Sequence, residues 1–311
     1  MKVFAVVPTF RRPDVARRCV EGLLAQTRPP DRIIVVENTP EPELVDAFGS
    51  PAVEVVHPGW NTGAAGGFGI GADVAVEQGA THVLFVDDDC LLEQHTIERL
   101  LVHLPYLRDA ALGPVVTSDG ETLVWEVYRP DGRPYRCRSE LPGHPIPTRS
   151  FANHGLLVSA DAIRRLGGPR KDLFFGGEDV EFCMRLAAGG IRLFYCPDAW
   201  AMHHPLRYRR FWFFGWRQVV DGSPGHRYYV LRNRLILWRL HHRDSPITGV
   251  VRPIAAEFLG LMASTSRLRR ARLLMAAVRD GLLRSPSRTL RNDVPLHDGS
   301  SPQRETGAIS S

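Results

Sequence analysis

Three consecutive aspartates, Asp87, Asp88 and Asp89, directly follow the apolar run at residues 83–86. An apolar run without polar alternation is typical of a strand buried on both faces, and ligands of open α/β sheets bind beyond the carboxyl ends of strands. Adjacent carboxylates repel one another unless a cation gathers them, and oxygen ligands suit Mg²⁺ or Mn²⁺. The triplet therefore predicts a metal site at a strand end; the alternative is a solvated acidic turn.

A second pair of acids, Glu178 and Asp179, follows two phenylalanines and two glycines, ending in Gly177. These acids stand in the first turn of a predicted helix over residues 178–188, where the helix dipole favours negative charge. A carboxylate beside an apolar mouth that includes Phe175 is also suited to act as a general base. Both interpretations remain open from the sequence alone.

Two further stretches have weaker chemical signals. Residues 61–68, NTGAAGGF, open a predicted helix with small residues that would let a backbone approach an anion. A tight packing turn between strand and helix explains the same glycines equally well. His203 and His204 end an apolar stretch, where a histidine serves as a metal ligand or as a surface residue.

These side chains need a framework of strands and helices. The predicted strands cover residues 3–7, 32–37, 53–57, 81–86, 111–117, 151–158 and 191–195. The predicted helices cover residues 13–26, 61–78, 91–104, 159–166 and 178–188. Strand and helix alternate at short spacing, which favours an α/β fold with a parallel sheet and helices on both faces. The polar residues 120–147 are expected to form an insertion that faces an acceptor.

The composition of the 311 residues is that of a globular protein, with 44% apolar and 23% charged residues. Five scattered cysteines without a CxxC pair indicate neither a disulfide framework nor a zinc site, so a reducing cytoplasm is expected. The first residues do not resemble a signal peptide, and no stretch reaches the length of a membrane span.

The net charge of +5 is uneven, because arginine gathers after residue 206. We expect a first domain over residues 1–205, an aromatic and basic helical region over 206–285 and a disordered tail over 286–311. Residues 266–283 form a basic amphipathic helical pattern. Such a helix, together with the aromatic residues 211–216, would suit the anionic cytoplasmic face of a membrane. Ordinary packing on the domain is the alternative.

Taken in order, six stretches resemble the family 2 glycosyltransferases, which are inverting enzymes of the GT-A fold. They are PTFRR, VEN, NTGAAGGF, VDDD, GGEDVEF and an apolar strand that ends in histidine. The resemblance covers residues 3–204. The glycine-rich stretch and the later YYVLRN look most like the bacterial rhamnosyl- and galactofuranosyltransferase branch, whose donors are dTDP-rhamnose and UDP-galactofuranose.

The resemblance implies a role for each matched residue. Residues that bind the donor nucleotide would be Thr9, Phe10, Arg12, Glu37, Asn61, Gly66, Gly67, Asp87 and Asp88. Residues that hold Mn²⁺ or Mg²⁺ would be Asp89, Asp87 and His203. Asp179 would be the catalytic base, with Glu178, Phe175 and Gly177 binding the acceptor, a glycan or a lipid-linked molecule. No nucleic-acid partner is expected, and the oligomeric state is left open.

Three other functions are alternatives to this one. A sugar-1-phosphate nucleotidyltransferase should carry a glycine-rich basic loop after its first strand, where this chain has PTFRR. A phosphatase with an aspartate nucleophile should carry its acids after the first strand, whereas these follow the fourth. A glycan-binding subunit without activity would not need Asp87, Asp89, Asp179 and His203 together.

Overall fold

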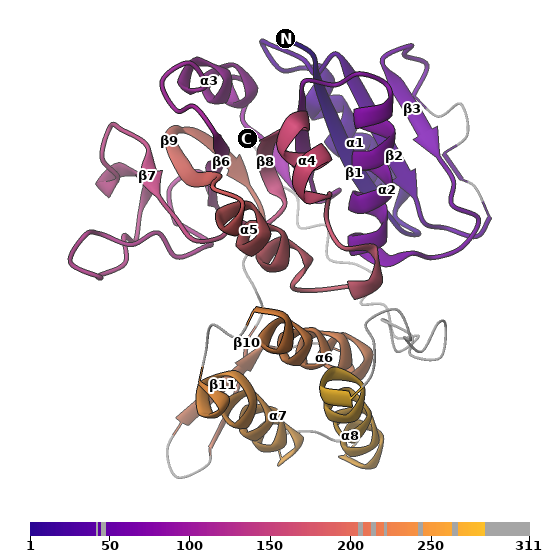
Figure 1. Cartoon of the computed structure of the whole chain (residues 1–311), viewed down its shortest axis with the longest axis vertical. Coiled ribbons are helices and arrows are strands. Elements are labelled where there is room, and N and C mark those ends of the chain that lie inside the picture. The colour runs from indigo at the N-terminus through magenta and orange to yellow at the C-terminus, as the bar shows by residue number, and fades with distance from the viewer. Residues whose placement is uncertain are drawn as a thin grey trace, which may run out of the picture. The chain divides into compact units, whose positions relative to one another are not determined.

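The computed structural model describes residues 1–41, 43–44, 48–204, 208–212, 216–220, 223–241, 245–262 and 267–283. The chain forms two compact units, Met1–Leu206 and Arg207–Ser311 (Figure 1). Each unit is described by itself below.

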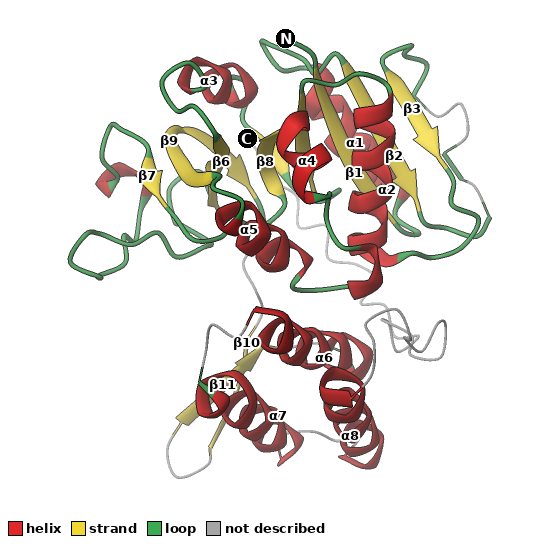
Figure 2. Cartoon of the chain, in the orientation of Figure 1, coloured by secondary structure: helices red, strands yellow, loops and turns green. Residues whose placement is uncertain are grey.

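The first unit is built on a nine-stranded sheet (Figure 2). Its strands are β1 (Val3–Thr9), β2 (Arg32–Glu37), β3 (Val53–Val56), β4 (His82–Val86), β5 (Leu91–Leu92), β6 (Ala110–Thr117), β7 (Ile146–Pro147), β8 (His154–Ser159) and β9 (Arg192–Met202). The strand order is β3-β2-β1-β4-β8-β6-β9-β5, and β7 pairs with β9. The first four strands are parallel, but β8 runs antiparallel to both β4 and β6. The sheet is therefore mixed, and the expectation of a purely parallel sheet is wrong.

Helices cover both faces of the sheet, as the alternation of strands and helices predicts. The helices of this unit are α1 (Pro13–Leu24), α2 (Gly63–Glu77), α3 (Thr96–His103), α4 (Ala160–Leu166) and α5 (Glu178–Ala188). Successive side chains of a strand point to opposite faces. Phe4 and Val6 of β1 accordingly pack into the core beneath α2, α4 and α5. Val3, Ala5 and Val7 pack into the core beneath α1 and α3.

Three predicted elements differ from the structure near the site. The expected helix over residues 91–104 begins only at Thr96, because Leu91 and Leu92 pair with β9 as strand β5. The expected strand over residues 151–158 begins at His154. Strand β9 continues past Pro197 to Met202, and a register shift against β6 accommodates the interruption. The first and third differences bring additional strand segments, β5 and the end of β9, close to the aspartates.

The described residues of the second unit form a hairpin and three α-helices. Its elements are β10 (Tyr208–Trp212), β11 (Trp216–Val220), α6 (Pro224–His241), the π-helical turn η3 (Ile247–Val251), α7 (Arg252–Met262) and α8 (Arg267–Leu283). Tyr228 of α6 donates a hydrogen bond to buried Asp280 of α8 at 2.7 Å. The predicted tail over residues 286–311 lies outside the described residues. Within the described part of the chain, every helix is too short or too polar to cross a bilayer.

Candidate active site at the ends of β4 and β9

The middle aspartate of the triplet is tied to the first strand. Asp88 is buried and accepts a hydrogen bond from the Thr9 hydroxyl at 2.6 Å, and it pairs with the Arg12 guanidinium. Burial raises the pKa of Asp88 to about 6, although the Arg12 charge and the Thr9 hydrogen bond act in the opposite direction. Asp88 thus joins the end of β4 to the residues that follow β1. Thr9, Arg12 and Asp88, which are all predicted to bind the nucleotide, therefore meet at this point.

Asp89, the last aspartate of the triplet, contacts both Arg12 and His203. Its carboxylate accepts from Arg12 Nη1 at 3.0 Å and lies 3.3 Å from His203 Nε2. Burial opposes ionisation of Asp89, but the hydrogen bond from His203 and the Arg12 charge hold its pKa well below the usual range. His203 therefore faces the triplet, whereas the neighbouring His204 is exposed. His203 is also the residue to which the resemblance assigns a role in metal binding, and that role stays a prediction.

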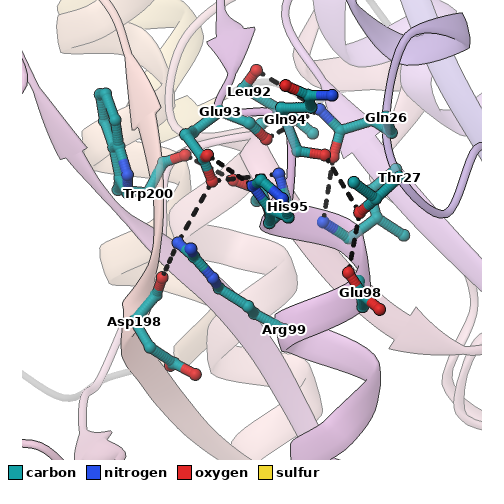
Figure 3. Close-up of polar contacts among 12 residues, drawn as sticks. Gln26, Thr27, Leu92, Glu93, Gln94, His95, Glu98, Arg99, Asp198 and Trp200 are labelled. Atoms are coloured by element: carbon teal, nitrogen blue, oxygen red, sulfur yellow. Dashed lines mark hydrogen bonds and ion pairs between the residues drawn. The ribbon is translucent and has the colours of Figure 1, made fainter.

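A polar network fixes the segment after the triplet against β9. The Glu93 N–H donates to the Trp200 carbonyl at 3.0 Å, and Arg99 Nη1 donates to the Asp198 carbonyl at 2.6 Å (Figure 3). The side-chain amide of buried Gln26 donates to the Glu93 carbonyl at 2.8 Å. Strand β5 pairs Leu91 with Met202, one residue before His203. The network therefore holds Asp89 and His203 in register.

Asp89 and His203 together fit a divalent cation that is completed by a ligand. Among the described residues, no three histidine, cysteine, aspartate or glutamate side chains form a complete metal cage. Mg²⁺ commonly takes one or two carboxylates and completes its coordination with substrate phosphates and water. The buried Nδ1 of His203 has no hydrogen-bond partner among the described residues, so the neutral ring can carry its proton there and leave the Nε2 lone pair for a cation. One carboxylate and one imidazole suit Mn²⁺ or Mg²⁺ bound with a diphosphate.

The second acidic pair lies at the start of α5. Glu178 is buried, and its Oε2 has no hydrogen-bond partner among the described residues. Asp179 is partly exposed, and its Oδ1 accepts the N–H of Val180 at 2.7 Å. Burial raises the pKa of both acids, and the charge of Asp87 raises them further. Phe182 of α5 packs edge-on against Phe85 of β4 with ring centroids 5.6 Å apart, so the two acidic clusters lie on elements that are in contact.

Helix α5 is anchored by an arginine that the sequence analysis did not single out. Arg185 forms a bidentate pair with buried Glu181 and donates to the carbonyls of Leu166 at 2.6 Å and Gly168 at 2.8 Å. Those carbonyls lie at and just beyond the end of α4, which packs on the sheet. The position of the acids on α5 is thus set by the contacts of α5 with α4.

The loop before α5 has a constrained backbone. Phe174 has a φ of +64°, and Gly176 and Gly177 follow with φ of +79° and +85°. The carbonyl of Phe174 accepts the N–H of Ala65 at 3.1 Å, which joins this loop to the start of α2. A Cβ on Gly63 would lie 2.0 Å from the same carbonyl, so only glycine fits there. The glycine-rich stretch therefore supports the loop that carries Phe175 and Gly177.

The remaining glycines of the stretch serve packing. A Cβ on Gly66 would lie 2.4 Å from the Thr62 Cβ, and one on Gly67 would lie 2.5 Å from the Pro8 Cβ. Asn61 Oδ1 accepts the N–H of Gly63 at 2.8 Å. These contacts favour the packing explanation, and the donor-binding roles of Asn61, Gly66 and Gly67 stay predictions.

Buried Asn38 organises the start of α2 and was overlooked in the sequence. Its Oδ1 accepts the Thr62 N–H at 3.2 Å, and its amide donates to the Gly63 carbonyl at 3.3 Å. Its position directly after Glu37 at the end of β2 was the available signal. Glu37 is itself buried and accepts the backbone N–H groups of residues 43 and 44 at 2.9 and 3.2 Å. Its role toward a nucleotide remains a prediction.

Two more residues at the site were missed in the sequence. His154, the first residue of β8, places its Nε2 3.2 Å from Asp87 Oδ2 and its ring against that of His203, with centroids 4.1 Å apart. Trp125, from the insertion over residues 120–147, donates its indole N–H to His154 Nδ1 at 2.9 Å. An aromatic residue in a polar insertion was the only sequence signal for Trp125. Phe10, also predicted to bind the nucleotide, is partly exposed beneath the Arg11 guanidinium.

Comparison with known proteins identifies the class to which this fold and site belong. Residues 4–163 match the family description Glycosyl transferase family 2, and the chain belongs to that family. It is 33% identical over 257 residues to galactofuranosyltransferase GlfT1 of Mycobacterium tuberculosis, covering 75% of this chain and 80% of the relative. It is 24% identical over 246 residues to the dTDP-rhamnosyl transferase RfbF of Shigella flexneri, covering 77% and 81%. The predicted family and branch are therefore confirmed.

Solved structures confirm the GT-A fold. GalNAc-T7, crystallised with UDP, GalNAc and Mn²⁺, superposes with a TM-score of 0.55 at 14% identity, covering 76% of this chain and 48% of that chain. The mannosyltransferase PcManGT of Pyrobaculum calidifontis, in complex with GDP-mannose and Mn²⁺, gives a TM-score of 0.50 at 17% identity, covering 89% and 74%. The protein is a family 2 glycosyltransferase, which removes the nucleotidyltransferase and phosphatase alternatives.

Proposed function

We propose that this enzyme transfers galactofuranose or rhamnose from a UDP- or dTDP-linked donor to a hydroxyl of a glycan or lipid-linked acceptor, with inversion and with Mn²⁺ or Mg²⁺. The relatives named for galactofuranosyl and rhamnosyl transfer support this choice of sugars. The observation that carries the proposal is that the two acidic clusters lie on packed elements, because Phe85, two residues before Asp87, contacts Phe182, three residues after Asp179, with ring centroids 5.6 Å apart.

The donor half of the site uses the ends of β1, β4 and β9. Asp89 and His203 would hold the cation, with Asp87 beside them. A divalent cation stabilises the charge that develops on a departing diphosphate. Arg12 already pairs with Asp88 and Asp89, so its guanidinium lies where it can also contact a phosphate. Thr9 and Asp88 would fix the nucleotide from the side of β1.

The acceptor half of the site uses the start of α5. Asp179 would take the proton from the acceptor hydroxyl as that oxygen attacks the anomeric carbon. The raised pKa of Asp179 suits this role, because a general base works best when its pKa approaches the operating pH. The unpaired Oε2 of Glu178 would bind a hydroxyl of the sugar or acceptor, since a buried polar atom needs a partner. A single displacement inverts the anomeric centre.

A donor panel tests the function. UDP-, dTDP- and GDP-linked sugars are each added with Mn²⁺, and the rise in melting temperature is measured together with slow release of the nucleoside diphosphate. We expect UDP-galactofuranose or dTDP-rhamnose to give the largest shift and measurable release. Binding without any release, in the presence of bacterial glycan acceptors, would instead favour a glycan-binding subunit on the same fold.

We also propose peripheral binding to an anionic membrane through the second unit. Leu268, Arg272, Met275, Arg279 and Leu283 are all exposed and recur every three or four residues along α8, so they share one helix face. The buried face of α8 contains Ala277, Asp280 and Gly281. Apolar and arginine side chains on one exposed face suit the interface of an anionic bilayer.

Flotation with liposomes of phosphatidylglycerol and phosphatidylcholine tests the membrane proposal. Replacing Leu268 and Met275 by glutamate should abolish flotation, and added salt should weaken that of the wild type, because each basic residue near the surface contributes about 1 kcal/mol. Val102→Glu is the matched control, since Val102 is exposed on α3 of the first unit. Equal flotation of all three proteins would remove the proposal. The side chains of the predicted aromatic stretch, residues 211–216, lie outside the described part.

A further inference from the structure

We propose that Trp125 and His154 form a relay that orients Asp87 for the cation and donor, with His154 acting as a positioning residue and not as a metal ligand. The purpose given to the relay, which is to orient Asp87 for the cation and donor, rests on the proposed function. The contacts of Trp125 with His154 and of His154 with Asp87 are a property of the metal-free protein. The geometry that supports it comes from three segments far apart in the chain.

The first step concerns the protons of the relay. The indole N–H of Trp125 can only donate a hydrogen bond, so His154 Nδ1, at 2.9 Å, must be the acceptor. A neutral imidazole that accepts at Nδ1 carries its proton on Nε2. That N–H lies beside the Asp87 carboxylate, with Nε2 3.2 Å from Oδ2, which is within ion-pair distance. Trp125 therefore selects the tautomer of His154 that can hold the Asp87 carboxylate.

The second step separates the roles of two stacked histidines. The rings of His154 and His203 lie with centroids 4.1 Å apart and an interplanar angle of 29°. His154 uses both of its nitrogens within the protein, whereas Nδ1 of His203 has no partner among the described residues. Trp125 keeps the proton of His154 on Nε2, so that nitrogen has no lone pair for a cation, whereas His203 can carry its proton on Nδ1 and present the Nε2 lone pair beside Asp89. The buried ring of His154 supports His203 from one side and Asp87 from the other.

The third step explains how a strand residue comes to face the triplet. The pairing of β4 with β8 shifts between Phe85 and Val86, so that Val86 lies opposite His154 and Gly155 is left out of the ladder. Gly155 has a φ of +107°, and a Cβ there would lie 2.8 Å from the Pro114 Cγ. Bulges of this kind redirect a side chain and are frequent beside active sites. The bulge at Gly155 turns His154 toward Asp87.

The fourth step gives the consequence for the cation. Outer partners of metal-binding groups hold them in place, and their loss typically weakens metal affinity about 10–100-fold. The Asp87 N–H also donates to the Asn153 carbonyl at 2.8 Å, so the backbone and the side chain of Asp87 are both held by the start of β8. Releasing the side chain alone should therefore loosen the carboxylate without displacing the triplet.

Nitrogen-15 NMR of the metal-free full-length protein tests the relay directly. For His154 we expect a protonated Nε2 and an unprotonated Nδ1 at neutral pH. In Trp125→Phe, which keeps an aromatic ring but removes the N–H, the two tautomers should mix. A proton on Nδ1 in the wild type would overturn the proposal, whether or not the protein binds a metal.

Mn²⁺ affinity in the presence of UDP, followed by electron paramagnetic resonance, tests the purpose of the relay. His154→Phe keeps a flat ring against His203 but cannot donate, so affinity should fall about 10–100-fold. His154→Gln loses the ring but keeps an N–H near the position of Nε2, so it should restore most of the affinity. His82→Phe is the matched control, since His82 lies at the opposite end of the same β4–β8 pair.

The opposite ranking, with normal affinity in His154→Phe and weak affinity in His154→Gln, would show that stacking alone matters and would overturn the relay. A wild type that binds no Mn²⁺ under any condition would contradict the metal role in the proposed function. The NMR result would then decide the relay by itself.

Discussion

Replacing Asp179 by asparagine removes the proposed base while leaving its local structure in place. Oδ1 of Asp179 accepts the N–H of Val180 at 2.7 Å at the start of α5. The oxygen of an asparagine amide can accept the same hydrogen bond, so the helix start should persist. What is lost is the ability to take a proton. General-base catalysis contributes typically about 10²–10⁴-fold, which corresponds to about 2.7–5.5 kcal/mol of transition-state stabilisation.

The assay for this variant measures turnover and donor affinity separately. With a saturating donor, turnover of Asp179→Asn should fall by about 10²–10⁴-fold. Its affinity for the donor and for Mn²⁺, measured by calorimetry, should stay close to that of the wild type. Glu178→Gln serves as the neighbouring control. It should lower turnover less than Asp179→Asn does, because Glu178 is proposed to bind a hydroxyl of the sugar or acceptor. Normal turnover of Asp179→Asn would refute its assignment as the base. Loss of donor binding in this variant would move Asp179 to the metal or nucleotide site.

Three other predictions follow from the same geometry. Burial raises the pKa of Asp179, and the base must be ionised, so activity should fall on acidification at a pH above the usual aspartate range; an acid limb near pH 4 would contradict this. Asp89→Ala should abolish transfer and weaken Mn²⁺ binding, and undiminished activity of this variant in EDTA would refute the metal role. Gly63→Ala should lower the free energy of unfolding by more than about 1 kcal/mol, because its φ is +72° and the Phe174 carbonyl occupies the space. Gly22→Ala in α1, where a Cβ meets nothing within 4 Å, should stabilise instead, and equal denaturation midpoints for the two variants would contradict the argument.

The parts of the site that were predictable depend on short-range patterns. The uninterrupted apolar run before Asp87 identifies β4, and the two glycines before Glu178 identify the start of α5. Serine is a common first residue of a helix, and the hydroxyl of Ser159, at the start of the predicted helix over residues 159–166, accepts the Ala162 N–H at 3.1 Å. In these cases the residues that determine the element are neighbours in the chain, so their spacing contains the information.

The parts that were not predictable depend on pairing between distant segments. The direction of β8 relative to β4 is decided by the topology of the whole sheet, and an apolar strand has the same pattern in either direction. His154 reaches Asp87 only because Gly155 leaves the ladder, and Trp125 reaches His154 across 29 residues of sequence. The space at Gly67 is limited by Pro8 of β1. No local signal in the sequence reports such contacts.

Release of nucleoside diphosphate with and without a divalent cation tests the central claim most directly. Wild-type protein and Asp89→Ala are each incubated with UDP-galactofuranose and with dTDP-rhamnose, in Mn²⁺ or in EDTA, and free UDP or dTDP is quantified. We expect release only by the wild type in Mn²⁺, with one donor strongly preferred, because Asp89 and His203 would hold the cation at the diphosphate. Equal release in EDTA, or equal release by Asp89→Ala, would contradict a metal-dependent transferase site at the ends of β4 and β9.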